Sequence, residues 1–350
     1  MNGIKWLFGA LLLTISAVQA ECPPRFQGVE LPEGKYLPLY NAPACVDVNG
    51  ENVHIWASFT YWNVYQQNME VAFVPPVTAV TEAAVVPGSV VAMGNHWSPG
   101  YKVGAACKTD YDEWVAFAEY TWIRSATSVS AANETGNAAL NLSSTQLFPS
   151  DLSLSATSIQ SKWFMHLDQI DVALSRPYYQ GIYLIANPFL GMRGLFIRER
   201  QSGDATTTAG PNSVVLKSKC WSVGPVGGIS GQWLLGKGVR FEGSSAASLL
   251  YTRYNELSCK FAGPNQFPAH AKQNNLNAIR PVLELGMGMG WGSYIYNHSY
   301  FLDFSIDYQF KYYWSQNMMR TLSSLEALWE SNFIGALMIH GLVVTGKFDF

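Results

Sequence analysis

Residues 302–315 read LDFSIDYQFKYYWS, and apolar or aromatic side chains occupy every second position of this run. A two-residue period is that of a β-strand with two unlike faces, since an α-helix repeats every 3.6 residues. The run is longer than the roughly 5–6 residues of a usual globular strand, and it exceeds the roughly 9–11 residues with which a tilted strand crosses a bilayer. It therefore predicts a membrane-crossing strand with one apolar face and one polar face.

Similar alternation in residues 282–292 and 335–350, and β-branched and aromatic residues elsewhere, including separate stretches at 214–224 and 228–236, predict further strands. Because lipid offers no partner for an open sheet edge, these strands predict an all-β, antiparallel transmembrane β-barrel with an even number of about 12–16 strands. Polar or Pro-rich stretches predict a turn at 187–188, a short helix-like stretch at 322–329, and long loops, including extracellular ones, over 66–100, 125–161, 201–212 and 255–278.

Composition fits this fold without requiring it. Charged residues make up 13% of the chain, about half the roughly 25% of a soluble domain, whereas aromatic residues reach 14%. A mean hydropathy of +0.04 is too low for a bundle of membrane helices. A formal charge of −3 gives no reason to expect a nucleic-acid partner. A soluble, secreted all-β protein with aromatic-rich strands fits the same composition.

The N-terminus predicts export. Lys5 precedes an apolar run at 6–15, and Val18-Gln19-Ala20 approaches a small-x-small cleavage pattern. We expect a signal peptide at 1–20 and a single barrel domain at 21–350, beginning with an irregular segment at 21–50. The mature chain has no apolar stretch of the roughly 18 residues needed for a membrane helix.

Five cysteines would remain after export. Cys22 and Cys45 bracket a Pro-rich segment and could form a disulfide that closes a local loop. An odd count leaves at least one thiol free or paired between chains, and the alternative is that several cysteines are simply buried.

In a barrel, strand parity divides the side chains between lumen and lipid. The polar parity gives candidate pore-lining residues, namely Glu284, Asp303, Asp307, Lys311, Arg193 and Glu199. The apolar parity gives candidate lipid-facing or girdle residues, namely Trp114, Tyr120, Trp122, Trp291, Phe304, Tyr312 and Trp314. Long loops that fold into the lumen could instead dominate the constriction.

No motif predicts catalysis. The six histidines are scattered without the spacing of a zinc site, and neither a G-x-S-x-G motif nor a P-loop is present. Gly286, Gly288 and Gly290 lie within a predicted strand, so they do not form a dinucleotide-binding loop. We expect His166, Asp168 and Asp171 to contribute a polar patch facing the lumen. The sequence predicts no enzyme, no metal site and no cofactor.

Several segments resemble the chlamydial-type major outer membrane protein family, and more closely its relatives in legionellae and environmental chlamydiae. They are HIWASFTYWNVYQQNMEVAF (54–73), GYKVGAAC (100–107), YDEWVAFAEYTWIRS (111–125), LDQIDVALSRPYYQGIYLIANPFLGMRGLFI (167–197), WSVGPVGGISGQWLL (221–235) and VVTGKFDF (343–350). The resemblance implies a pore-forming protein of the bacterial outer membrane, passing small solutes and often disulfide-linked into larger assemblies. The terminal Phe350 resembles the assembly signal of such barrels.

These observations favour an outer-membrane porin that forms a water-filled channel for small hydrophilic solutes. The expected partners are outer-membrane lipid, the barrel-assembly machinery and the solutes, with a homo-oligomer or disulfide-linked assembly left open. The alternative is a barrel acting in adhesion or host attachment through loops 66–100 and 125–161, or as a structural envelope protein. An outer-membrane phospholipase or acyltransferase would need a Ser/His pair at the rim, and the sequence offers no convincing one.

Overall fold

The computed structural model describes residues 53–74, 88–109, 114–133, 142–144, 155–180, 183–264, 266–295, 300–322 and 334–350. Within these ranges, fifteen strands form one antiparallel sheet. Ten of them close into a barrel, because β7 pairs with both β5 and β9, and β1 pairs with β15. Around the barrel they are β1 (Val53–Gln66), β4 (His96–Lys108), β5 (Val115–Ala132), β7 (Ser155–Ser175), β9 (Leu184–Thr207), β10 (Gly210–Gly236), β11 (Val239–Gly263), β13 (Leu276–Ile295), β14 (Tyr300–Asn317) and β15 (Gly335–Asp349).

Short elements lie outside this ring. They are β2 (Glu70–Val74), β3 (Ser89–Ala92), β6 (Leu142–Ser144), β8 (Tyr178–Gln180), β12 (Gln266–Gln273) and the 3-10 helix η3 (Met319–Leu322). No helix among the described residues is long and apolar enough to span a membrane.

The antiparallel barrel is confirmed, but the ring contains ten described strands, not the predicted 12–16. The count was too high because β10 is one strand of 27 residues, whereas the sequence suggested separate strands at 214–224 and 228–236. The predicted turn at 187–188 and much of the loop at 201–212 both lie within β9. Strands also enter the other three predicted loops, and of the predicted helical stretch only Leu322, in η3, lies within the described residues.

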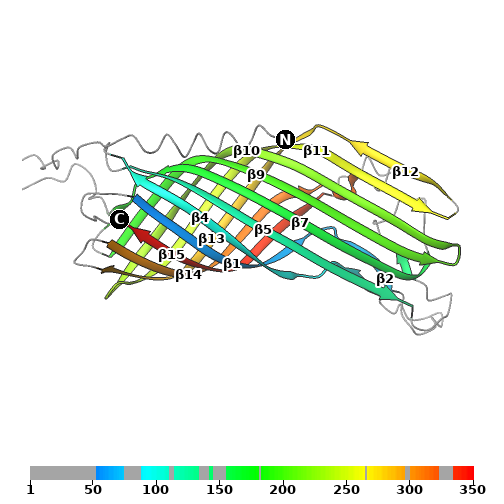
Figure 1. Cartoon of the computed structure of the whole chain (residues 1–350), viewed down its shortest axis with the longest axis horizontal. Coiled ribbons are helices and arrows are strands. Elements are labelled where there is room, and N and C mark those ends of the chain that lie inside the picture. The colour runs from blue at the N-terminus through cyan, green and yellow to red at the C-terminus, as the bar shows by residue number, and fades with distance from the viewer. Residues whose placement is uncertain are drawn as a thin grey trace, which may run out of the picture.

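The two ends of the barrel differ. At the end where β1 begins and β15 finishes, the connections between ring strands are short, including a tight turn at 237–238. We call this the turn end. At the opposite, loop end the connections are mostly longer, spanning 67–95, 133–154, 264–275 and 318–334. Figure 1 shows the long strands β9, β10 and β11 extending far beyond β1, β14 and β15 at the loop end.

Along the long strands, the apolar side chains change from the outer face near the turn end to the inner face near the loop end. Near the turn end of β9, Leu190 and Met192 are exposed on the outer wall and Arg193 is buried inside. Farther along, Leu195 and Ile197 are buried inside while Arg198 is exposed outside. β7, β10 and β11 show the same exchange. An apolar exterior suits lipid and a polar exterior suits water, so this exchange marks the level at which the outer wall leaves the hydrocarbon.

An apolar core fills the barrel interior toward the loop end. Inward side chains of β7, β9, β10 and β11 pack there against residues of β1, of β2 and of the segment around η3. η3 joins β14 to β15, yet it contacts β10, β11 and β12, so this segment crosses the interior. The loop-end half of the barrel is therefore filled, and the turn-end half holds the open space described next.

Candidate functional site

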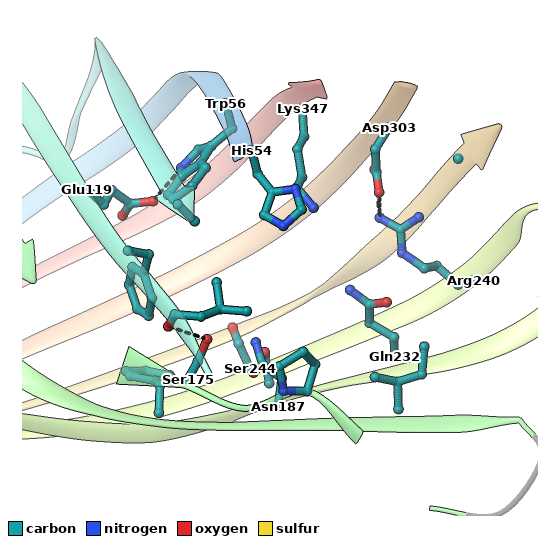
Figure 2. A pocket seen from close by; sticks show the side chains of 18 of the residues that line it. His54, Trp56, Glu119, Ser175, Asn187, Gln232, Arg240, Ser244, Asp303 and Lys347 are labelled. Carbon is teal, nitrogen blue, oxygen red and sulfur yellow. Dashed lines mark hydrogen bonds and ion pairs between the residues drawn. The ribbon is translucent and has the colours of Figure 1, made fainter. Parts of the chain in front are cut away.

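A cavity of about 940 Å³ occupies the turn-end half of the barrel interior. Residues of the tight turn at 237–238 contribute to its lining, so the cavity reaches the surface at that end. Its walls are inward-facing side chains from strands all around the barrel. Figure 2 labels ten of them: His54, Trp56, Glu119, Ser175, Asn187, Gln232, Arg240, Ser244, Asp303 and Lys347.

Paired charges line this cavity. Glu119 accepts a hydrogen bond from Trp56 Nε1 at 3.0 Å (Figure 2). Glu119 also forms an ion pair with Lys102 at 2.8 Å. On the other wall, Arg240 donates to Asp303 at 2.7 Å and also contacts Glu242. These pairs join inward side chains from different strands of the barrel wall.

A second group of charges lies near the mouth. His54 Nδ1 lies 2.9 Å from Asp349, and Lys347 Nζ lies 3.1 Å from the same carboxylate. β1 and β15 are neighbours at the chain's closing seam, and their register places His54 directly opposite Asp349. Both signs of charge therefore lie at the turn end of the cavity.

Side chains from opposite walls meet at the inner end of the cavity. Arg193 forms a bidentate pair with Asp171, at 2.7 and 2.9 Å, and reaches across the lumen to Glu284. Lys311 Nζ lies 3.4 Å from Glu284, while Tyr313 donates to Gln169 at 3.1 Å. β9 and β13 are separated by two strands in the ring, so these contacts span the interior. We call the six residues the transverse layer: Gln169, Asp171, Arg193, Glu284, Lys311 and Tyr313.

The transverse layer separates the cavity from the apolar core. Lys311 is 2% exposed, and its Nζ lies 5.4 Å from the ring centre of Trp62, which is 1% exposed and belongs to the core. Deeper in the loop-end half of the barrel, Arg320 of η3 is buried and contacts both the carboxylate and the carbonyl of Glu70. Burial lowers the pKa of Arg320 to about 10, and the Glu70 carboxylate opposes that shift, so the guanidinium stays charged at neutral pH.

The predicted pore-lining residues all face the interior, but they lie in different places. Glu284, Asp303 and Arg193 line the cavity, and Lys311 lies behind it in the transverse layer. Asp307 faces inward and accepts a hydrogen bond from Ser305 at 3.2 Å. Glu199 is buried near the loop end, between the core residues Ile197 and Met165.

Six of the predicted lipid-facing residues lie on the outer face of their strands, where Trp291, Phe304 and Trp314 are exposed, and the exposed Trp114 directly precedes β5. Tyr120, Trp122 and Tyr312 are partly covered there. The backbone of Phe350 exchanges hydrogen bonds with that of Val53. The signal peptide and the Cys22–Cys45 pair lie outside the described residues, and Cys107, Cys220 and Cys259 are free thiols.

Sequence reasoning missed Lys102, Glu119 and Arg240 as lumen residues. Each is an inward charge between outward neighbours, so strand parity could have identified Lys102, between Tyr101 and Val103. The expected lumen patch is wrong for His166 and Asp168, which face outward and lie 3.4 Å apart. They belong to the part of β7 where the polar face has moved outside.

Among the described residues, no group of three or more His, Cys, Asp or Glu could hold a metal ion.

Residues 51–350 match the family described as Legionella pneumophila major outer membrane protein precursor. No curated protein matches the chain.

Several solved structures match the chain at low identity and with low TM-scores. Ail, the attachment invasion locus protein of Yersinia pestis, is 8% identical with a TM-score of 0.22, covering 85% of this chain and 98% of that one. The translocator domain of the autotransporter NalP from Neisseria meningitidis is 12% identical with a TM-score of 0.29, covering 87% and 91%. The P. putida toluene transporter TodX is 8% identical with a TM-score of 0.21, covering 85% and 89%.

Proposed function

This chain belongs to the family of the Legionella pneumophila major outer membrane protein, and from that premise we propose that it is a narrow channel for small hydrophilic solutes. The protein is a β-barrel of the bacterial outer membrane. The observation that carries the proposal is the cavity of about 940 Å³, lined by charged side chains inside a barrel whose outer wall is apolar. Such a lumen offers ions and polar solutes a favourable path through the hydrocarbon.

The lengths of the connections orient the channel. Outer-membrane barrels turn tightly on the periplasmic side and carry long loops outside. The turn end, with the cavity mouth, is then periplasmic, and the loop end, with the apolar core, is extracellular. Assembly by the barrel-assembly machinery through Phe350, and association into oligomers, belong to this proposal.

The size of the barrel limits what could pass. Wide aqueous channels occur in barrels of roughly 16–18 strands, whereas about eight strands leave an interior that side chains fill. Ten strands lie near the lower limit, so we expect ions and the smallest polar solutes to be the substrates. The charged members of the transverse layer and the nearby Lys102–Glu119 pair contribute three cations and three carboxylates, so the path should discriminate weakly by sign.

Conduction also needs the extracellular half to open. The conformation described here is closed there, because the core packs Trp62 against the transverse layer. The inserted segments, β2 and the region around η3, come from connections between ring strands. We propose that they move aside without breaking the barrel ladder.

Planar-bilayer recording tests the channel. Refolded wild-type protein should show small, infrequent current steps, and Trp62→Ala should show severalfold larger or longer ones, since it empties space beside Lys311. Phe59→Ala is the matched control, because Phe59 lies on the outer face of the same strand and should leave the current unchanged. Heat-modifiable migration in detergent gels verifies refolding. Refolded barrels that pass no current in either form would refute the channel.

A second candidate, attachment to host cells, is favoured by the length of the extracellular wall. β9, β10 and β11 span 24, 27 and 25 residues, whereas about 9–11 cross a membrane, so a firm platform projects outward. Shortening the connection at 133–154 should then abolish attachment of bacteria to host cells while conductance persists. Attachment that survives the deletion would argue against this role.

A further inference from the structure

The outer wall of the projecting strands carries an unusual concentration of cations. Three neighbouring cross-strand rows run over β5, β7, β9, β10, β11 and β12, and their registers place residues of each row side by side. The rows hold eight Lys or Arg residues and a single carboxylate, Glu256, although the whole chain has 22 basic and 25 acidic residues. We call these eight the basic wall: Arg124, Lys162, Arg198, Arg200, Lys217, Lys219, Lys260 and Lys272.

Within the described ranges, most of this charge has no ion-pair partner. Lys219 pairs with Glu256 at 2.7 Å, and this is the one ion pair that the described residues provide to the basic wall. Arg198 and Arg200 are exposed on β9, and Lys162 is exposed beside them on β7. Cations that outnumber the nearby carboxylates on a rigid sheet repel one another, so an anionic ligand would relieve that repulsion.

The basic wall lies directly beyond an aromatic row. In that row, Trp122, Phe196 and Trp221 occupy β5, β9 and β10, with Asp168 between the first two. The next row toward the loop end is the first row of the basic wall, with Arg124, Arg198 and Lys219 on the same three strands. Aromatic side chains mark the interface of a membrane barrel, so the cations lie at the height of lipid head groups.

A groove opens on this wall. It has a volume of about 370 Å³, and its lining includes Lys162 and Arg200, the exposed ring of Phe164, and the small side chains of Ala126 and Ser202. Phe164 and Arg200 are cross-strand partners, as are Lys162 and Ser202. Lys162 and Arg200 lie beside small side chains that leave room for a phosphate group between the two cations, and the apolar ring of Phe164 lies at the edge of the groove.

We propose that the basic wall binds the phosphate groups of a phosphorylated glycolipid in the outer leaflet, with one phosphate in the groove between Lys162 and Arg200. The acyl chains of that lipid would lie on the apolar belt below the aromatic row. A membrane lipid fits better than a soluble polyanion, because the wall faces sideways over the bilayer and continues directly from the lipid-facing surface. The inference rests on the outer-membrane location and does not depend on conduction.

Binding of lipid A to the refolded full-length chain in detergent tests this inference. Native mass spectrometry compares diphosphoryl lipid A with its dephosphorylated form on the wild type. It then compares Lys162→Gln/Arg200→Gln with the charge-retaining control Lys162→Arg/Arg200→Lys. We expect the neutralised variant to bind diphosphoryl lipid A about tenfold more weakly, since charge-assisted phosphate contacts are lost, and the control to bind nearly as well as the wild type. Dephosphorylated lipid A should bind weakly to all three proteins.

Three results would overturn the proposal. Equal affinity of the wild type and the neutralised variant would show that these cations make no contact with the lipid. Equal binding of the two lipids to the wild type would show that phosphate is not recognised, and this result needs no variant to fold. Binding of soluble heparin with no binding of lipid A would assign the wall to a soluble polyanion.

Discussion

Replacing Arg193 with methionine is expected to lower the free energy of unfolding by about 3 kcal/mol, the lower end of the cost of breaking a buried ion pair. Arg193 is 3% exposed and holds the carboxylates of Asp171 and Glu284 together across the lumen. Methionine fills similar space but leaves the two carboxylates facing each other with Lys311 as the nearest cation. Urea titration of the refolded barrel, followed by tryptophan fluorescence, measures the change.

Arg198→Met is the matched control for this substitution. Arg198 lies on the same strand but is exposed on the outer wall, so its loss should change the stability by no more than about 0.5 kcal/mol. If the two variants unfold at the same urea concentration, the transverse layer does not stabilise the barrel. Lower stability in both would indicate a general intolerance of β9.

Placing an arginine at Met287 is expected to destabilise the barrel in lipid by about 2–4 kcal/mol, the cost of a cation at the membrane midplane. Met287 is 62% exposed on the outer face of β13, between the exposed Leu285 and Met289. In Met287→Arg, the new arginine side chain would have to leave the hydrocarbon to reach water. Reversible folding of the variant into vesicles, titrated with denaturant, gives the difference from the wild type.

Ile279→Arg provides the comparison on the same strand and face. Ile279 is 64% exposed but lies nearer the loop end, beside Tyr251, where the cost of a cation falls to about 0–1 kcal/mol. Similar losses at both positions would show that the two residues lie at the same depth. A negligible loss at Met287 would mean that this face does not contact lipid.

Strand prediction succeeded where one face meets lipid for the whole length of a strand. β14 is such a case, because Phe304 and Ile306 stay outside while Asp303 and Ser305 stay inside. Prediction failed on β9, where residues around Gly203 and Asp204 resemble a loop. They lie beyond the lipid, so the apolar residues move to the inner face and the outer face becomes polar. A single continuous strand then contains two opposite patterns.

The sequence also predicted only part of the candidate site. Parity alone was enough to place Arg193, Glu284 and Lys311 on the inner face of their strands. It could not predict that Arg193 and Glu284 meet, since they are 91 residues apart and lie on strands that are not neighbours. Which inner residues oppose one another depends on the number and stagger of the strands. Both were unknown until the ring of ten strands was defined.

The seam between β1 and β15 determines when this protein can fold. Residues from His54 to Gln66 pair with residues from Asp349 back to Leu337. The first strand of the ring therefore cannot complete its hydrogen bonding until the last strand is in place. Until the final residues have emerged, every intermediate keeps two bare strand edges that can pair with another chain. Closure must therefore follow the translocation of β15.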